Sequence, residues 1–540
     1  MRRPANTGQS EPNKSSLHML EIQKRLSNSF YALLALPATA MGFGLSIQIA
    51  ALSWLLTYRY GLEISDIGLV WATGPIAGIL GQVIIGIISD KVWIWNGRRR
   101  AFIIIGGVLA SLMILALPNI GVIQAGLGLE GVLGIAILIS MILDLSINVS
   151  FNPTRSIIAD VTPEGRERTK GYTWMQTVSG TFGVLSYAIG AIFGNIVLLY
   201  FGVFLVFFFS VIPPFFIKEP KYLGRYGEDE DAIARELSGK DDMPQSVNDA
   251  SLIRILISIR PLWGFLMYGI YAIIKRLSGF EFPGYYFEIF ALIVTVYLVA
   301  ETLFKSEEGK SREEAGKIGF QKVLAAHSFS WVGVQSMFIY FFAFVSYRMP
   351  DLTAEGVGSV VNWSFFSLNL VAAIIPVLAL APLANRFGRV RTHATALVIM
   401  VIGYSLIIFF GHFGIGIYDF RSSETFYIPI SLYLLMFVVG IGWASIISLP
   451  FAIMSQKIAQ NQMGLYMGLF NLSVVLPQLV SSFAVGDIVQ AVDNKTILLV
   501  ICAVTVAMSA VSWFLVSEPK DEMTENPALL DEKIEKKLEE

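Results

Sequence analysis

Long apolar stretches recur from one end of this chain to the other. Many reach the length of about 20 residues at which a helix crosses the roughly 30 Å hydrocarbon core of a bilayer. A helix satisfies its own backbone hydrogen bonds, so it needs no water inside the membrane. The 540 residues are 55% hydrophobic and 15% charged, whereas soluble proteins carry about 25% charged residues. The sequence therefore predicts an all-α integral membrane protein that crosses a lipid bilayer many times.

Composition and motifs argue against several other classes of protein. A net charge of −2 gives no basic surface for nucleic acid. The alternating segments of about ten residues that build a transmembrane barrel do not occur in the sequence. We also find no cluster of metal ligands, no phosphate-binding loop and no nucleophile–base pair at a known spacing. We therefore expect no enzyme, no metal and no cofactor, and interpret the single cysteine, Cys502, as a small core residue.

The apolar stretches form two predicted bundles of six spans, which gives twelve core transmembrane helices. The first bundle, 30–217, contains spans near 30–57, 66–88, 101–118, 131–160, 172–193 and 196–217. The second bundle, 323–516, contains spans near 323–345, 359–382, 392–411, 427–449, 464–487 and 496–516. A polar segment, 1–29, precedes the first bundle, a middle loop, 218–322, joins the two, and a charged tail, 517–540, follows.

The distribution of Lys and Arg predicts the orientation, because cytoplasmic loops carry an excess of these residues. Connections on one side hold eleven of them: Lys91, Arg98, Arg99, Arg100, Arg166, Arg168, Lys170, Arg386, Arg389, Arg391 and Lys457. Connections on the other side hold four: Arg59, Arg348, Arg421 and Lys495. We therefore expect a multi-pass protein of the plasma (inner) membrane, with both termini and the middle loop in the cytoplasm.

The middle loop contains a hydrophobic insert, 251–304. Its second part, 285–304, is long and apolar enough to span, whereas its first part, 252–274, is interrupted by Arg254, Arg260 and Pro261. Both parts must cross or neither can, because the flanking bundles fix the side on which the insert begins and ends. We favour a pair of additional crossings over the alternative of two helices lying at the membrane interface.

Two connections repeat a short motif. In the first bundle, Asp90 is followed by Gly97-Arg98-Arg99-Arg100, and in the second, Asn385 is followed by Gly388-Arg389-Val390-Arg391. We interpret the first copy as a cytoplasmic gate, in which Asp90 pairs with the arginines of its loop and with the end of span 131–160 near Asp160. The alternative is that the basic residues only anchor a short loop.

Asp144 is the most informative polar residue, because a long uncharged run, 131–143, precedes it. A charge at that depth in a bilayer costs several kcal/mol unless it is paired, solvated or protonated. On a helix, Asp144, Asn148, Phe151 and Arg155 follow at i, i+4, i+7 and i+11 and share one face. Such a face offers hydrogen-bond partners for sugar hydroxyls and an aromatic plane for the sugar ring.

Two alternatives concern the same face. A structural Asp144–Arg155 ion pair is disfavoured, because eleven residues extend about 16 Å along a helix. Arg155 can instead pair with Asp160 or face a cavity, and the sequence does not separate these two possibilities.

Further candidates for the wall of a central cavity come from other spans. They are Gln48, Trp71, Gln82, Trp331, Gln335 and Trp443. The alternative for each tryptophan is packing in the core or at the lipid interface. We interpret His327 and His412 as interfacial residues near the ends of their spans, and His393 as part of a basic loop.

Two parallel bundles of six helices are the architecture of the major facilitator superfamily. Within it, the chain resembles sucrose–proton symporters and the wider glycoside–pentoside–hexuronide cation symporters. The resemblance rests on strings around Trp71, Gly74-Pro75 and Gln82, on Gly97-Arg98-Arg99-Arg100, and on Asp144, Asn148, Pro153, Arg155 and Asp160. Weaker matches are Trp174-Met175, Gly468, Asn471 and Pro477-Gln478.

This resemblance implies sugar–proton symport by alternating access, with the proton and the sugar meeting at Asp144. It is incomplete, because the insert is foreign to the plant pattern and the span 323–345 contains no carboxylate. A Na⁺-coupled or uncoupled carrier is the alternative within the class, and a non-transporting sugar sensor is the alternative outside it. We expect the protein to function as a monomer.

Overall fold

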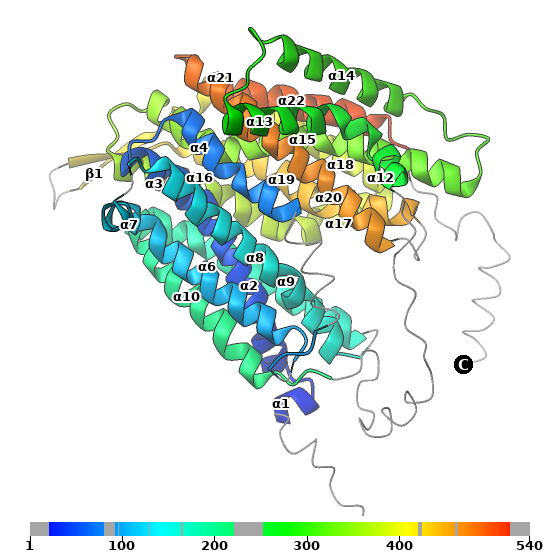
Figure 1. The fold of residues 1–540 in the computed structure, drawn as a ribbon, viewed down its shortest axis with the longest axis horizontal. Coiled ribbons are helices and arrows are strands. Elements are labelled where there is room, and N and C mark those ends of the chain that lie inside the picture. The colour runs from blue at the N-terminus through cyan, green and yellow to red at the C-terminus, as the bar shows by residue number, and fades with distance from the viewer. Residues whose placement is uncertain are drawn as a thin grey trace, which may run out of the picture.

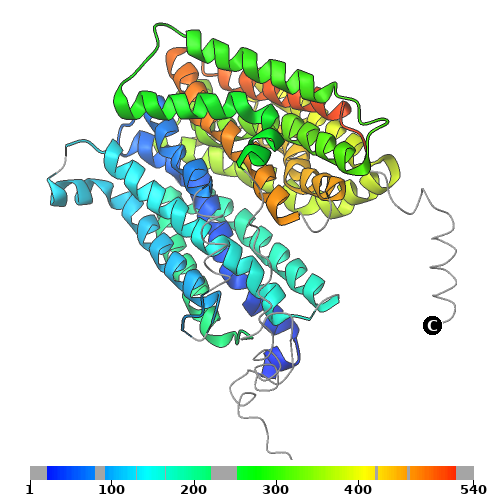
Figure 2. The same ribbon diagram turned by 45° about the vertical axis from the view of Figure 1, so that its right-hand side comes forward.

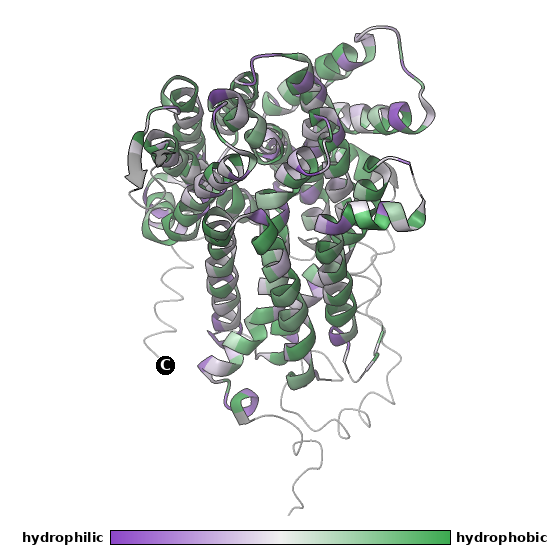
Figure 3. Cartoon of the chain, turned by 90° about the vertical axis from the view of Figure 1, so that its left-hand side faces the viewer, coloured by the Kyte–Doolittle hydropathy of each residue, from purple (hydrophilic) through white to green (hydrophobic). Residues whose placement is uncertain are grey.

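The computed structural model describes residues 21–79, 92–95, 97–128, 130–163, 166–220, 252–419, 424–458 and 463–518. Eleven helices within these ranges are long and apolar enough to cross a membrane, and Figure 3 shows that hydrophobic residues dominate their length. The predicted all-α membrane architecture is confirmed. The predicted segment boundaries, including the bundles 30–217 and 323–516, stay predictions.

The first group of helices runs from α1 to α10. Its elements are α1 (Glu21–Lys24), α2 (Asn28–Ile47), the π-turn η2 (Gln48–Leu52), α3 (Ser53–Tyr58), α4 (Ile64–Trp71), α6 (Arg100–Ala116), η3 (Leu117–Asn119), α7 (Ile120–Leu127), α8 (Leu133–Val161), α9 (Arg166–Phe193) and α10 (Asn195–Phe216). The predicted span 66–88 is described only as far as Ile79.

The second group runs from α15 to α22. Its elements are α15 (Arg312–Arg348), α16 (Ala354–Ile375), the π-turn η5 (Pro376–Leu380), α17 (Ala381–Phe387), α18 (Arg389–Phe410), α19 (Ile430–Lys457), α20 (Met463–Val480), the π-turn η7 (Ser481–Val485), α21 (Gly486–Ala491) and α22 (Ile497–Phe514). Two antiparallel strands, β1 (Ile415–Asp419) and β2 (Glu424–Ile428), form a hairpin that we did not predict. The hairpin displaces the start of the predicted span 427–449, because α19 begins after Pro429.

The two groups meet at one end and diverge toward the other (Figures 1 and 2). We call the end where α6 and α18 begin, at Arg100 and Arg389, the basic end. Hydrogen bonds between the groups lie at the opposite end. They join the Trp54 indole to the Ala354 carbonyl (2.6 Å), the Asn362 amide to Asn195 (2.7 Å), the Ser359 hydroxyl to the Ala191 carbonyl (2.9 Å) and the Ile64 backbone N–H to Gln490 (3.0 Å).

The insert forms α12 (Leu252–Ser258), η4 (Arg260–Leu262), α13 (Trp263–Ser278) and α14 (Tyr286–Leu303). It lies along the second group, where α14 packs beside α15 and α13 beside α20 (Figure 1). Arg276, near the end of α13, pairs with Asp487 of α21 at 3.0 Å, and Arg260 pairs with Glu301 of α14 at 2.7 Å. The two long insert helices are therefore antiparallel and extend along the bundle, and their two additional crossings stay a prediction.

The opposite end closes through a glycine contact. A Cβ added at Gly68 of α4 would overlap the Ser482 carbonyl and the Tyr340 hydroxyl of the second group. The two groups can come this close only because residue 68 has no side chain, since atoms in packed interfaces do not interpenetrate. Gly68 therefore permits the two groups to touch.

We predict that Gly68→Leu opens this end. The measurement is the distance between spin labels at Glu130→Cys and Asp493→Cys, in exposed connections of the two groups, and we expect a longer distance in the variant. Gly134→Leu is the matched control, because no atom lies within 4 Å of its added Cβ. Cys502 is buried, so it leaves little background labelling. Equal distances in both variants would contradict the contact.

Candidate functional site

A cavity of about 460 Å³ lies between the two groups. This volume is in the range of small-molecule sites, which enclose about 300–1,000 Å³. Residues from both groups line it, and they include eight that the sequence predicted: Gln48, Trp71, Asp144, Asn148, Phe151, Trp331, Gln335 and Trp443. Of the two remaining predicted substrate residues, Gln82 lies outside the described ranges, and Arg155 is not part of the lining.

Asp144 joins three helices of the first group at this cavity. Its side chain is only 8% exposed. One carboxylate oxygen accepts a hydrogen bond from the Gln48 amide, and the other accepts one from the Thr73 hydroxyl, both at 2.8 Å. A Cβ added at Gly74 would lie 3.5 Å from this carboxylate, so α8 and the chain after α4 pack closely here. No Lys, Arg or His side chain pairs with Asp144 in the described ranges.

The backbone explains how these partners reach Asp144. Gln48 opens the π-turn η2, and such single wide turns re-aim side chains and recur at functional sites. The Thr73 hydroxyl also lies 2.7 Å from the Val70 carbonyl, so its single hydrogen is shared between that carbonyl and Asp144. We did not predict Thr73 as a site residue, although it stands between Trp71 and Gly74 in the string that carried the resemblance.

Of the other residues predicted on this face of α8, Asn148 and Phe151 line the cavity, whereas Arg155 lies nearer the basic end. The Asn148 amide donates to the Asp144 carbonyl at 2.8 Å and lines the cavity with Phe151. Arg155 is exposed, and its guanidinium carbon lies 4.0 Å from the centre of the Phe151 ring. Asp160 pairs with Arg99 at 3.0 Å. An ion pair between Asp144 and Arg155 is therefore absent from this structure, as the distance argument predicted.

The second group contributes an aromatic wall. Trp443 meets Trp331 edge-on at 5.8 Å and Phe338 edge-on at 5.3 Å between ring centres. The Trp443 indole donates to Asn369 at 3.3 Å, and the Gln478 amide donates to Gln335 at 3.1 Å. These contacts leave indole faces and amides around the cavity, which suits a ligand with an apolar ring face and several hydroxyls. Tyr187 and Asn369, which we did not predict, also line the cavity.

Two histidine predictions are wrong. His327 is not interfacial, because it is 1% exposed within α15 and stacks on Phe470 of α20. His393 is not part of a loop, because α18 begins at Arg389 and buries it against Trp513 and Ser445. Hydropathy alone could not show either position, because both depend on neighbours that are distant in the sequence.

In the predicted cytoplasmic gate, the arginine loop makes contacts through its backbone N–H groups as well as through its side chains. Asp90 lies outside the described ranges. The backbone N–H groups of Arg98, Arg99 and Arg100 all donate to the Glu219 carboxylate, at 2.7–2.8 Å. A carboxylate in this position satisfies N–H groups that have no partner inside the helix and complements the positive end of the helix dipole. Glu219 therefore caps α6.

The second group repeats this cap. The Glu518 carboxylate accepts the backbone N–H groups of Arg389, Val390 and Arg391 at 2.8–3.1 Å. A Cβ added at Gly97 or at Gly388 would overlap the capping carboxylate, which accounts for both glycines of the repeated motif. The sequence analysis missed both glutamates, although Glu-Pro-Lys follows the last helix of each group, at 219–221 and at 518–520.

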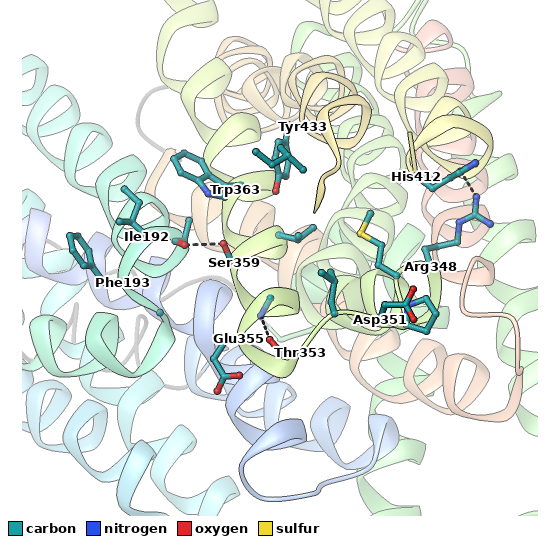
Figure 4. Close-up of a pocket in the computed structure, with 18 residues that line it drawn as sticks. Ile192, Phe193, Arg348, Asp351, Thr353, Glu355, Ser359, Trp363, His412 and Tyr433 are labelled. Carbon is teal, nitrogen blue, oxygen red and sulfur yellow. Dashed lines mark hydrogen bonds between the residues drawn. The ribbon is translucent and has the colours of Figure 1, made fainter. Parts of the chain in front are cut away.

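A larger cavity, of about 1,110 Å³, lies at the opposite end (Figure 4). Trp363 and Tyr433 line it, and so does the pair formed by Arg348 and His412 at 2.8 Å. The hydrogen bond from Ser359 to the Ala191 carbonyl runs along its wall and joins the two groups there (Figure 4). This cavity therefore borders the contact that holds the opposite end together.

We predict that Glu219→Ala and Glu518→Ala each lower the free energy of unfolding by about 1–2 kcal/mol, because each removes a helix cap. Thermal unfolding in detergent, followed by intrinsic fluorescence, measures this loss. The control is Glu308→Ala, at an exposed position before α15. Midpoints equal to that of the control would contradict the capping role.

Curated relatives resemble part of the chain. Sucrose transport protein SUC4 of Arabidopsis thaliana is 28% identical over 191 residues, which cover 33% of this chain and 37% of that protein. The general alpha-glucoside permease of Schizosaccharomyces pombe is 29% identical over 172 residues, which cover 30% of this chain and 31% of that protein. The matched segments thus span about a third of the length of these relatives.

Solved structures resemble nearly the whole fold. The peptide transporter POT in complex with sulfate superposes with a TM-score of 0.57 at 15% identity, over 90% of this chain and 94% of that one. The inward-open xylose transporter XylE from E. coli gives 0.54 at 15% identity, over 93% and 99%. At such low identity these likenesses establish the fold alone.

The family model of the Major Facilitator Superfamily matches residues 34–482, which reach from α2 into η7. That match takes in both groups of helices and the cavity between them. The chain is therefore a member of the Major Facilitator Superfamily, a family of membrane transporters and not of enzymes.

Proposed function

We propose that this protein is a sugar–proton symporter that carries a glycoside or disaccharide by alternating access. The observation that carries the proposal is Asp144, a buried carboxylate in the central cavity that is held by two neutral donors. A carboxylate shielded from water can take up and release a proton near physiological pH. The partial similarity to a sucrose transport protein and an alpha-glucoside permease supports a sugar as the substrate.

The contacts of Asp144 suggest how proton and sugar binding are linked. The ionised carboxylate accepts the Gln48 amide and the Thr73 hydroxyl. A proton on Asp144 removes its charge, weakens its hold on these donors and frees them for sugar hydroxyls. Proton binding therefore favours sugar binding, and by thermodynamic linkage sugar binding favours proton binding to the same degree.

A proton suits this site better than Na⁺ as the coupling ion. Sodium requires several oxygen ligands around one point, as hard cations do in general. Here the two hydrogen bonds to the carboxylate come from an amide N–H and a hydroxyl O–H, whose hydrogens point toward it. These donors stabilise negative charge on Asp144 and leave the ion without a cage of oxygens.

We predict that Asp144→Asn abolishes sugar accumulation driven by a pH gradient, because the amide cannot exchange a proton, while sugar exchange across the membrane persists in part. Uptake of labelled disaccharides into proteoliposomes, with and without the gradient, measures both. Asp493→Asn, in an exposed connection, is the control. Full accumulation by Asp144→Asn would show that Asp144 does not carry the coupled proton. Accumulation driven by a Na⁺ gradient alone would show that Na⁺, not the proton, is the coupling ion.

The excess of basic residues supports a cytoplasmic location for the basic end, for both termini and for the loop before α15, in a plasma (inner) membrane. With this orientation, the contacts at the opposite end close the protein toward the outside. The structure then corresponds to a state whose cavity faces the cytoplasm.

Labelling of single cysteines with a membrane-impermeant maleimide on intact cells tests this orientation. We expect Glu130→Cys and Leu277→Cys to react from outside, and Glu308→Cys to react only after permeabilisation. Leu277 is 84% exposed between α13 and α14, so its reaction also tests whether the insert crosses the membrane. Reaction of Leu277→Cys only after permeabilisation would place the insert on the cytoplasmic side.

A further inference from the structure

His327 is a buried titratable group that the proposed mechanism does not use. It lies within α15, one helical turn from Trp331, and is 1% exposed. The Trp331 indole N–H donates to the His327 Nε2 atom at 2.9 Å. The imidazole ring also stacks on Phe470 of α20, with ring centres 5.1 Å apart and planes 13° apart. His327 therefore holds a side chain that lines the central cavity.

The direction of this hydrogen bond fixes the protonation state of His327. An indole N–H can only donate, so Nε2 must present a lone pair, and a neutral imidazole then carries its proton on Nδ1. Nδ1 is buried, and it has no hydrogen-bond partner within the described ranges. Buried polar groups are nearly always satisfied, so an unpaired one of this kind indicates a functional group or a site for a water molecule.

The groups around His327 provide little competing charge. His393 of α18 is the titratable neighbour, and its own Nδ1 bonds the Ser445 hydroxyl of α19 at 2.6 Å. From α22, Ser509 donates to the Ala326 carbonyl at 2.7 Å. Tyr466 of α20 lies further toward the basic end, against Phe320. Lys322 lies five residues before His327, and it is paired with Glu307 at 3.2 Å.

We infer that His327 is a second proton-binding site, which controls the aromatic wall of the sugar cavity through Trp331. A proton that binds Nε2 forms an N–H bond and occupies the lone pair that accepted the indole hydrogen. The imidazolium then has two donors and no acceptor, so the hydrogen bond from Trp331 breaks. The freed indole N–H can donate to a hydroxyl of a bound sugar.

This inference rests on the proposed function, and it deepens it. The present conformation holds the neutral, Trp331-bonded form of His327. Proton uptake at His327 and sugar binding at Trp331 favour each other, because both require the same hydrogen bond to break. Each group of helices would then contribute one proton-binding residue that acts on the cavity, Asp144 in its wall and His327 behind Trp331.

The first experiment needs no sugar. Trp331 fluorescence, taken as the difference between wild type and Trp331→Phe, is followed from about pH 3 to 8, a range wide enough to include the acid titration of a buried histidine. We expect a titration that disappears in His327→Gln, because the amide can still accept from the indole but does not bind a proton. His393→Gln, a variant of the neighbouring buried histidine, is the matched control and should keep the titration. A signal without titration in wild type, or one unchanged in His327→Gln, would overturn the inference.

The second experiment tests the link to the substrate. Sugar affinity is measured by exchange in proteoliposomes at acid and neutral pH. In Asp144→Asn we expect sugar affinity still to fall by up to about tenfold per pH unit above the His327 titration midpoint, where the free His327 is neutral, and we expect His327→Gln to remove this dependence. His327→Asn provides a smaller amide if the first variant folds poorly. Absence of sugar exchange in wild type would contradict the proposed function but would leave the fluorescence test of His327 in force. An unchanged pH dependence of sugar affinity in the Asp144→Asn, His327→Gln double variant would contradict the role of His327.

Discussion

The low dielectric of the membrane interior is the constraint on which the central site depends. A carboxylate there costs several kcal/mol unless it is bonded, hydrated or protonated. The protein places Asp144 where two helices of the same group supply a donor for each oxygen, Gln48 at the π-turn η2 and Thr73 beside Gly74. Hydrogen bonds to a charged group contribute about 1.5–3 kcal/mol each. The three-helix junction therefore stabilises the ionised form without a cation, and the charge remains free to be neutralised by a proton.

A second constraint is that each group must behave as one body if the two rock against each other. The repeated caps meet this requirement. Glu219 fixes the end of the first group to the start of α6, and Glu518 fixes the end of the second group to the start of α18. In both cases the closure joins segments more than 100 residues apart, and a glycine makes room for the carboxylate. The hydrogen bonds between the groups, by contrast, are scattered, as at Asn362–Asn195, and a rocking motion can break them.

Hydropathy and periodicity predicted most of the helices and the shared face of Asp144, Asn148 and Phe151, because these patterns are local. They did not predict Thr73 as a partner of Asp144, since that contact depends on how α8 meets the chain after α4. The burial of His327 was missed for the same reason: it depends on Phe470 of α20, and no local pattern near His327 records that contact. The hairpin β1–β2 was also missed, because most of its ten strand residues lie in a connection between two predicted spans.

The two titratable residues act on the cavity with the same sign, although their charges change in opposite ways. A proton neutralises Asp144 and releases the Gln48 and Thr73 donors, whereas a proton charges His327 and releases the Trp331 donor. In both cases the protonated site offers the cavity more free N–H and O–H groups, and the deprotonated site withdraws them into internal hydrogen bonds. Under the proposed function, a sugar whose hydroxyls accept each of these donors would therefore stabilise the protonated form on both walls. Loss of the protons on the cytoplasmic side would restore the internal bonds, which would compete with the sugar for the same donors and favour its release.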